Sequence, residues 1–113
     1  MRIAVIGSRE APKNASLLIL KQMPVNISEM VSGGANGIDQ AAAEVANTVN
    51  VPLKLFLPDY ERYGKRAPLV RNLEIIEYAD EVVAFWNGRS RGTQHVIASC
   101  LQRGKPVRVI PLP

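Results

Sequence analysis

Three short segments of the sequence combine glycine with hydroxyl, amide or basic side chains. They are residues 7–10, 32–39 and 88–93. Glycine lets the backbone approach an anion closely, and the free N–H groups at the start of a helix favour phosphate. A single segment of this kind is also typical of an ordinary strand-to-helix turn. Three of them, if they meet at one end of a sheet, favour a ligand that carries phosphate.

The residues in these segments divide by the part of a ligand that they would contact. We expect the first to bind one end of the ligand, the second to lie under a ribose or base, and the third to hold a phosphate. Arg71 would neutralise the charge of that phosphate, because a guanidinium can bind phosphate through two N–H groups. The candidate binding residues are Gly7, Ser8, Arg9, Gly33, Gly34, Asn36, Gly37, Asp39, Arg71, Asn72, Gly88, Arg89, Ser90, Gly92 and Thr93.

Basic residues lie beside tyrosines in the polar segment 59–68. Such side chains can bind single-stranded nucleic acid, by contacts to its backbone and by stacking on its bases. The candidates for that interpretation are Tyr60, Arg62, Tyr63, Lys65 and Arg66, together with Arg89 and Arg91. For Arg62 and Lys65 we favour a simpler interpretation, in which they pair with Asp59 and Glu61 on a solvated loop.

Few residues are suited to catalysis. Glu10 and Asp39 are candidates for a catalytic base, although Asp39 also suits a role in capping the second segment. His95 has no metal-ligating partner at a suitable spacing, so no metal site is predicted. The sequence contains neither G-x-G-x-x-G nor G-x-x-x-x-G-K-[ST], which argues against a bound dinucleotide and excludes P-loop ATP hydrolysis. No cofactor is predicted.

Short apolar runs alternate with helical patterns along the chain. The expected strands are residues 2–6, 27–31, 53–57, 81–86 and 106–110, with helices between them and a polar loop at 59–68. Because crossover connections are right-handed, this order predicts an open parallel sheet. The predicted fold is a Rossmann-like three-layer α/β/α sandwich of about five parallel strands, with helices on both faces. Ligands bind such sheets beyond the carboxyl ends of the strands, where all three segments are expected.

The apolar spacing also predicts which helical residues are buried. Leu17, Leu18 and Leu20 are expected on the buried side of the first helix. On the last helix the residues expected to be buried are Val96, Ile97, Cys100 and Leu101, and Gly104 is expected to end that helix.

Length and composition bound the class of protein. The chain has 113 residues, which predicts a single domain over 1–113, and 14 basic against 10 acidic residues give a net charge of +4. No apolar run approaches the roughly 20 residues of a membrane helix, and no membrane partner is expected. The single cysteine, Cys100, fits a reducing compartment. We therefore expect a cytoplasmic protein with an anionic partner.

Four segments taken together resemble a known family. They are VIGSR at 5–9, SGGANGID at 32–39, AFWNGRSRGT at 84–93, and the segment that contains Pro68, Arg71 and Asn72. They resemble the YspA/YpsA-related branch of the SLOG superfamily, which also contains the Lonely Guy phosphoribohydrolases and the DNA-processing protein A family. The resemblance covers almost the whole chain. It implies a Rossmann-like fold whose loops bind nucleotides or nucleotide-derived ligands.

The sequence departs from the two better-known branches at informative positions. Gly92 and Thr93 match the phosphate cradle of the Lonely Guy motif P-G-G-x-G-T-x-x-E, but Val96 stands where that motif has its catalytic Glu. The resemblance thus implies phosphate binding and leaves enzymatic activity open. The second segment is similar to S-G-x-A-x-G-I-D of DNA-processing protein A, which protects single-stranded DNA and loads a recombinase. Asn36 replaces the usual Arg of that motif.

The leading prediction is the binding or sensing of a nucleotide or a nucleotide-derived phosphate ligand. One alternative is a small nucleotide hydrolase similar to the phosphoribohydrolases, with Glu10 or Asp39 as its base. The other is an accessory protein that binds single-stranded DNA, as DNA-processing protein A does. A nucleotide-type small molecule is the expected partner ahead of nucleic acid, because the net charge is modest and aromatic residues are few. A homodimer or higher oligomer is also expected, since the superfamily commonly builds its sites at dimer interfaces.

Overall fold

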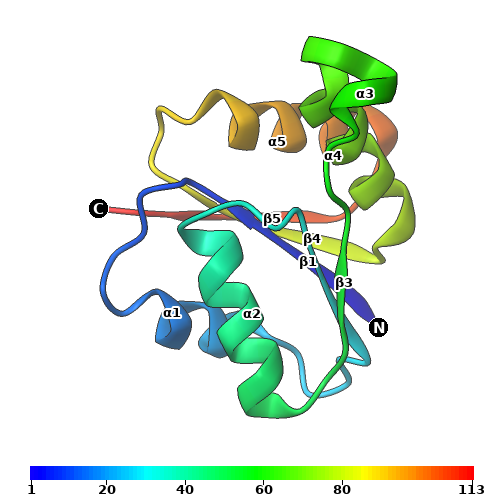
Figure 1. Ribbon diagram of the computed structural model, residues 1–113. Coiled ribbons are helices and arrows are strands. Elements are labelled where there is room, and N and C mark those ends of the chain that lie inside the picture. The colour runs from blue at the N-terminus through cyan, green and yellow to red at the C-terminus, as the bar shows by residue number, and fades with distance from the viewer.

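Five parallel strands form one sheet with β1 (Arg2–Gly7) at its centre (Figure 1). The computed structural model describes residues 1–113. The other strands are β2 (Glu29–Ser32), β3 (Leu53–Leu55), β4 (Glu81–Trp86) and β5 (Val107–Pro111), and the order across the sheet is β3-β2-β1-β4-β5. The central strands are continuously apolar because helices cover both of their faces.

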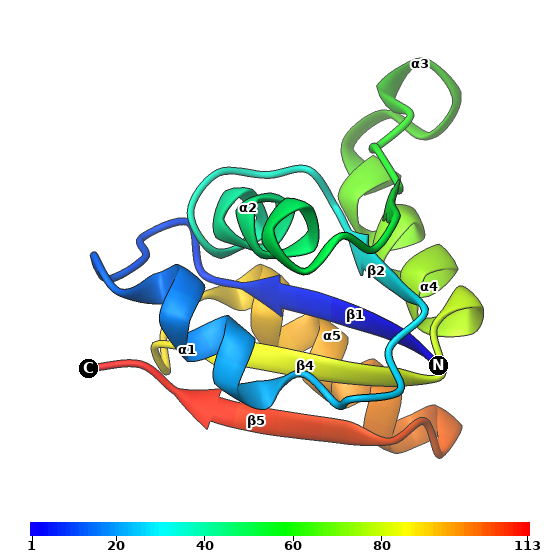
Figure 2. The ribbon, with the colours of Figure 1, turned by 90° about the horizontal axis from the view of Figure 1, so that it is seen from below.

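Helices cover both faces of the sheet (Figures 1 and 2). On one face lie α1 (Ala15–Gln22) and α2 (Ile38–Val49), and on the other lie α4 (Ala67–Tyr78) and α5 (Arg91–Arg103). Two short elements, α3 (Tyr60–Tyr63) and the 3-10 helix η1 (Gly64–Arg66), precede α4. The predicted three-layer Rossmann-like fold is therefore confirmed. None of the helices has both the length and the apolar character that crossing a bilayer requires.

The core has two halves because successive side chains of a strand point to opposite faces of the sheet. Ile3 and Val5 of β1 pack with buried residues of α1 and α2, together with Phe85 of β4. Ala4 and Ile6 pack on the other face with buried residues of α4 and α5. The alternation along β1 thus fixes both helical layers to the same central strand.

The direction of winding reverses between β1 and β4. The chain leaves β1 toward α1 on one face and leaves β4 toward α5 on the other, although Gly7 and Phe85 are partners in the same ladder. The loops that follow these strands therefore diverge and leave a crevice between them. In open α/β sheets this reversal point is the usual place for a ligand.

The predicted buried sides of two helices are wrong at particular leucines. In α1 the buried residues are Ala15 and Ile19, while Leu17 and Leu20 are 50% and 39% exposed. Ala15 and Ile19 are four residues apart and share one side of the helix, which Leu17 cannot reach. Leu101 of α5 is 70% exposed, whereas its neighbour Cys100 is buried as predicted. Gly104 ends α5 in the left-handed conformation, which confirms its predicted role.

The segment predicted as a polar loop at 59–68 is largely helical. Asp59 accepts a hydrogen bond from the backbone N–H of Arg62 at 3.2 Å and so caps α3, and α4 already begins at Ala67. No residue of α3 or η1 is buried, so the segment lacks the apolar periodicity that predicts a helix from sequence. As a result α3 projects beyond α4, away from the sheet (Figure 2).

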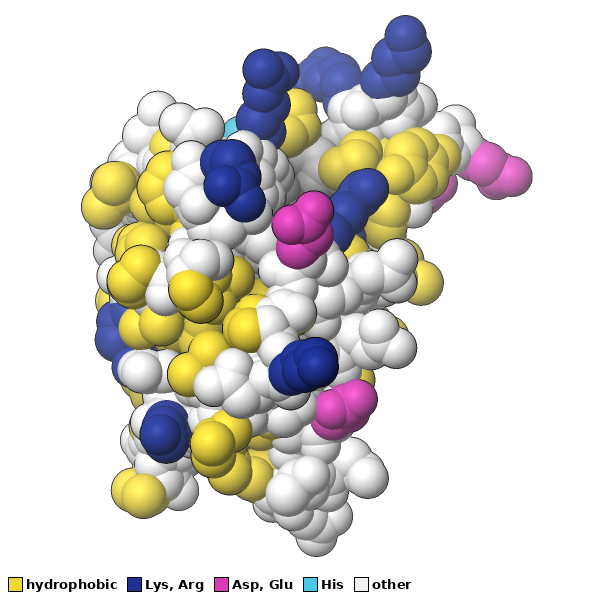
Figure 3. Space-filling view, turned by 90° about the vertical axis from the view of Figure 1, so that its left-hand side faces the viewer, with side chains coloured by type: hydrophobic (Ala, Val, Ile, Leu, Met, Phe, Trp, Pro, Cys, Tyr) yellow, Lys and Arg dark blue, Asp and Glu magenta, His cyan; other side chains and the backbone are white.

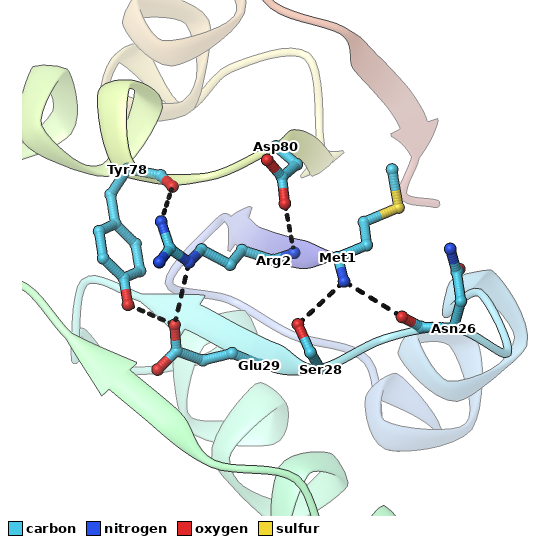
Figure 4. A network of polar contacts seen from close by, with 7 residues as sticks. All are labelled: Met1, Arg2, Asn26, Ser28, Glu29, Tyr78 and Asp80. Carbon is cyan, nitrogen blue, oxygen red and sulfur yellow. Dashed lines mark hydrogen bonds and ion pairs between the residues drawn. The ribbon is translucent and has the colours of Figure 1, made fainter.

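A network of polar contacts joins the strands at the amino end of the sheet (Figure 4). The backbone N–H of Arg2 donates to Asp80 Oδ2 at 2.7 Å, and the Arg2 guanidinium lies 4.2 Å from the centre of the Tyr78 ring. The Tyr78 hydroxyl donates to Glu29 Oε1 at 2.5 Å. These contacts tie β1 to β2 and to the turn between α4 and β4, on the side opposite the loops that carry the candidate ligand residues.

Candidate functional site

A pocket of about 520 Å³ opens at the carboxyl end of the sheet. Four segments form its walls: the loop after β1, the loop after β2 with the start of α2, the start of α4, and the loop after β4 with the start of α5. Only three of its 18 lining residues are hydrophobic, so it is suited to a polar ligand. Figure 3 shows the side of the molecule toward which the strands run, where Lys and Arg side chains gather over the half that carries α3 and α5.

The start of α5 forms one wall of the pocket and is capped by the protein itself. Ser90 is the N-cap residue, and its Oγ accepts a hydrogen bond from the Thr93 N–H at 3.3 Å. Asn87 Oδ1 accepts from the backbone N–H groups of Arg89 and Ser90 at 2.8 and 2.9 Å, which fixes the approach of the loop to the helix. The first turn contains no acidic residue. The helix dipole and the free N–H groups of that turn therefore favour an anion in the pocket.

Arg71 of α4 reaches across to the loop after β2. Its Nη1 donates to the carbonyl of Gly33 at 2.8 Å, and its Nε donates to Asn72 Oδ1 at 3.0 Å. A Cβ at position 33 would lie 2.6 Å from Arg71 Nη1, so only glycine leaves room for the guanidinium there. Arginine has five N–H donors, and those not used in these two bonds remain available to a ligand.

Asp39 and Ser8 bring unpaired polar atoms to the deep side of the pocket. Asp39 is 6% exposed, and its Oδ2 accepts from the Ala35 N–H at 3.1 Å while its Oδ1 has no partner. Burial raises the pKa of the Asp39 carboxyl, and the Ala35 hydrogen bond and the charge of Arg71 only partly offset this. The Ser8 hydroxyl is also buried and unpaired. Unpaired buried polar atoms are costly, so a strong reason is needed to keep two of them at one site.

Two glycines of the predicted set act by letting α2 approach the loop after β1. A Cβ on Gly7 would lie 2.5 Å from Ile38, and one on Gly37 would lie 2.1 Å from the carbonyl oxygen of Arg9. Gly37 also has a positive φ of 75°. Both glycines are thus required by packing, and only Gly7 lines the pocket.

Most of the predicted residues come together at the pocket. Those that line it are Gly7, Ser8, Arg9, Glu10, Gly33, Asp39, Arg71, Asn72, Arg89, Ser90, Gly92 and Thr93. The predicted residues that do not line it are Gly34, Asn36, Gly37 and Gly88. Gly34 is turned toward Leu57, where a Cβ would lie 2.7 Å from Cδ2, and Asn36 is exposed. The role of Glu10 or Asp39 as a base stays a prediction.

Six lining residues were not among the predicted binding set. They are Ile6, Ala35, Pro68, Leu69, Asn87 and Arg91. The sequence holds a signal for Asn87, because an Asn that directly follows a strand often accepts bonds from the next backbone N–H groups. Arg91 was predicted as a contact to nucleic acid. The apolar residues carry no such signal, since they line the pocket only because of how the loops pack.

An exposed aromatic and basic surface lies beside the pocket. We name it the α3 arm; it consists of Leu57, Tyr60, Arg62, Tyr63, Lys65 and Arg66. Tyr60 and Leu57 are 60% and 64% exposed, and the Arg62 guanidinium lies 5.2 Å from the centre of the Tyr63 ring. Leu69, which is 44% exposed, is part of both α4 and the pocket wall and so connects the two surfaces.

The predicted pairing of Arg62 and Lys65 with Asp59 and Glu61 is wrong. No ion pair joins any of these residues; the ion pairs of the chain are Arg2–Glu29 and Arg108–Glu81. Asp59 turns instead to the backbone of α3, which it caps. The basic side chains of the α3 arm are therefore free to contact an anionic partner.

Comparison with known proteins gives one relative in sequence and two in structure. No protein-family model matches the sequence. The Gene 61 protein of Mycobacterium phage D29 is 38% identical over 84 residues, which cover 69% of this chain and 67% of that protein. The X-ray structure of DNA processing protein A from Streptococcus pneumoniae superposes with a TM-score of 0.81 at 20% identity, over 99% of this chain and 50% of that one.

A second solved structure agrees with the first. It is that of DNA processing protein A from Helicobacter pylori, described with its single-stranded DNA binding mode, and it superposes with a TM-score of 0.77 at 20% identity. All of this chain is covered, against 66% of that protein. The chain thus spans about half and about two thirds of these two structures. At such low identity the likeness shows a shared Rossmann-like fold, which confirms the predicted resemblance to DNA-processing protein A at the level of the fold.

Proposed function

The chain belongs to the family of the Gene 61 protein of Mycobacterium phage D29, and from that starting point we propose that it binds single-stranded DNA with a backbone phosphate in the pocket. The name of the relative states no activity, so the proposal depends on the site. The observation that carries it is the pocket at the start of α5, where four arginines line a polar cavity whose wall, at Pro68 and Leu69, follows closely after the α3 arm in the chain. These arginines are Arg9, Arg71, Arg89 and Arg91.

Charge and geometry support a phosphate as the group that enters the pocket. The start of α5 offers N–H groups and the positive end of the helix dipole. Gly92 has no neighbouring atom within 4 Å of the position of a Cβ, so an anion can approach the backbone there. Arg71 keeps unused N–H donors, which can bind a phosphate at two points.

A strand of DNA fits the surroundings better than a free nucleotide. The pocket has few hydrophobic lining residues on which a base could pack. The α3 arm supplies what the pocket lacks, because its exposed tyrosines can stack on bases and its basic side chains can follow a phosphate backbone. Of the solved relatives, the Helicobacter pylori protein is described as binding single-stranded DNA. Binding of a single nucleotide, our leading prediction from sequence, becomes the second candidate, favoured by the unpaired Ser8 and Asp39 atoms.

We expect the protein to bind a fluorescein-labelled 20-nucleotide dT strand, measured by fluorescence anisotropy. Affinity should fall steeply with salt, because phosphate contacts release counterions. Arg71→Ala should raise the dissociation constant about tenfold or more. This is the change expected when one charge-assisted hydrogen bond or bidentate contact to phosphate is lost. Arg103→Ala is the matched control, since Arg103 lies at the opposite end of α5, and it should leave affinity close to that of the unchanged protein.

The tyrosines distinguish a strand from a single nucleotide. Tyr60→Ala with Tyr63→Ala should weaken binding of the dT strand, at about 1–3 kcal/mol per stacked base, and leave competition by dTMP unchanged. Tyr60→Phe with Tyr63→Phe keeps the stacking rings and should restore the affinity. If dTMP competes as strongly as the strand does, and the Ala pair has no effect, the protein binds a nucleotide and the strand proposal is wrong.

A further inference from the structure

A chain of side-chain hydrogen bonds runs from the pocket wall on α4 to His95 on α5. Arg71 Nε donates to Asn72 Oδ1 at 3.0 Å, and Asn72 Nδ2 lies 3.4 Å from His95 Nδ1. Asn72 is 5% exposed, so its amide depends on these partners and not on solvent. His95 is the one histidine of the chain and has no part in the proposed contacts to phosphate.

The chemistry of the donors fixes the orientation of each group. A guanidinium can only donate, so the amide of Asn72 must present its oxygen to Arg71. Its nitrogen then faces His95, and that nitrogen can only donate. His95 Nδ1 must therefore accept, which places the ring proton on Nε2.

We propose that His95 is a positioning residue, which acts through Asn72 to hold Arg71 toward the pocket. Without an acceptor at His95, the buried Asn72 amide would lose its donor bond and could rotate away from Arg71. Arg71 would then be held only by its bond to the Gly33 carbonyl. The inference rests on the proposed function in one respect, because it takes Arg71 to contact the ligand.

Two variants of His95 separate positioning from packing. His95→Asn keeps a polar group at the δ position, where it can accept from Asn72, whereas His95→Leu keeps similar bulk without an acceptor. We expect His95→Leu to weaken binding of the dT strand about three- to tenfold, the worth of one hydrogen bond, and His95→Asn to restore most of the affinity. In an Arg71→Ala background, His95→Leu should have no further effect, because its influence passes through Arg71.

The same variants can be tested without any ligand. Nitrogen-15 NMR of the free protein should show His95 with its proton on Nε2. It should also show the Arg71 Nε–H protected from exchange with water, and the protection should be lost in His95→Leu and kept in His95→Asn. A proton on Nδ1, or equal protection in both variants, would overturn the positioning role. So would an effect of His95→Leu that persists in the Arg71→Ala background.

Failure of the proposed function gives a different result. If the unchanged protein binds no DNA at any salt concentration, the proposed function is wrong, while the NMR measurements still decide whether His95 orients Arg71. Urea unfolding of each variant shows whether it is folded before either measurement is interpreted.

Discussion

Gly37 and Gly92 both stand at the start of a helix, but they tolerate a side chain very differently. Gly37 has φ 75° and ψ −121°, a conformation that is open almost only to glycine, and a Cβ there would lie 2.1 Å from the Arg9 carbonyl oxygen. Gly92 lies inside the first turn of α5 and has free space around it. The first glycine is required by the fold, while the second is available to a ligand.

Gly37→Ala should therefore destabilise the protein severely. Backbone strain and the clash with Arg9 each cost about 1–3 kcal/mol, so we expect a loss of about 3 kcal/mol or more in the free energy of unfolding, measured in urea. Gly92→Ala should be neutral or should stabilise α5 by up to about 1 kcal/mol. Equal losses in the free energy of unfolding of the two variants would contradict the conclusion that the fold requires Gly37 but not Gly92.

At this scale the sequence predicts which residue types gather at the site, but not which way each one faces. Gly33 and Gly34 are adjacent and chemically identical, yet Gly33 accommodates Arg71 while Gly34 turns toward Leu57. The difference depends on the positive φ of Gly34 and on the packing of a loop some twenty residues away in the chain. No local pattern encodes that contact, which is why Gly34 and Asn36 were predicted at the site and Ala35 was not.

Among the elements, α5 links stability to the proposed binding of anions through its N-cap. Ser90→Ala should remove the bond to the Thr93 N–H and lower the free energy of unfolding by about 1 kcal/mol. Ser90→Asp keeps a capping oxygen and suits the helix dipole, so stability should be retained. The new carboxylate would nevertheless repel phosphate, and affinity for the dT strand should fall. Urea unfolding and anisotropy together check this; a Ser90→Asp protein that binds DNA normally would place the phosphate elsewhere.

The order of strands and helices could be predicted from sequence, whereas α3 could not. The strands of the core are apolar runs and the larger helices have an apolar side, because both must bury surface. In α3 nothing is buried, and its helical turn depends on the cap at Asp59. A segment that protrudes leaves no periodic signal, so the part of the molecule proposed to contact bases is also the part whose structure was predicted wrongly.

For the molecule as a whole, resistance to acid should depend on the network at the amino end of the sheet. The hydrogen bond from the Arg2 N–H, with the nearby positive charges of the N-terminus, Arg2 and Lys105, lowers the pKa of Asp80 below its ordinary value of 3.8. Because the pKa is lowered in the folded state, ionised Asp80 contributes to the free energy of unfolding. That contribution is fully present above the ordinary pKa and is lost as the pH falls through the pKa of the folded state.

Asp80→Asn should consequently lower stability at neutral pH and make no difference in strong acid. Urea midpoints measured across this range should differ most near pH 7, and the difference should shrink as the pH falls below 3.8, where the unfolded state binds the proton. The midpoints should converge only below the lower pKa of the folded state, where both states are protonated. Glu61→Gln, at an exposed carboxylate without an ion pair, is the control and should run parallel to the unchanged protein throughout. A constant difference between Asp80→Asn and the unchanged protein would mean that Asp80 acts by packing and not by charge.

The pocket walls come from four segments that reach from Ile6 to Thr93. A bound strand would thus act as a cross-link between the first and the last βα units, which the sequence holds far apart. Global unfolding would then have to release the ligand. A free ligand concentration of 100 times the dissociation constant would add about 2.7 kcal/mol to the free energy of unfolding of the whole domain, and not only to the stability of one loop. Because folded domains are only marginally stable, we would expect the domain to resist proteolysis most strongly while a DNA strand is bound.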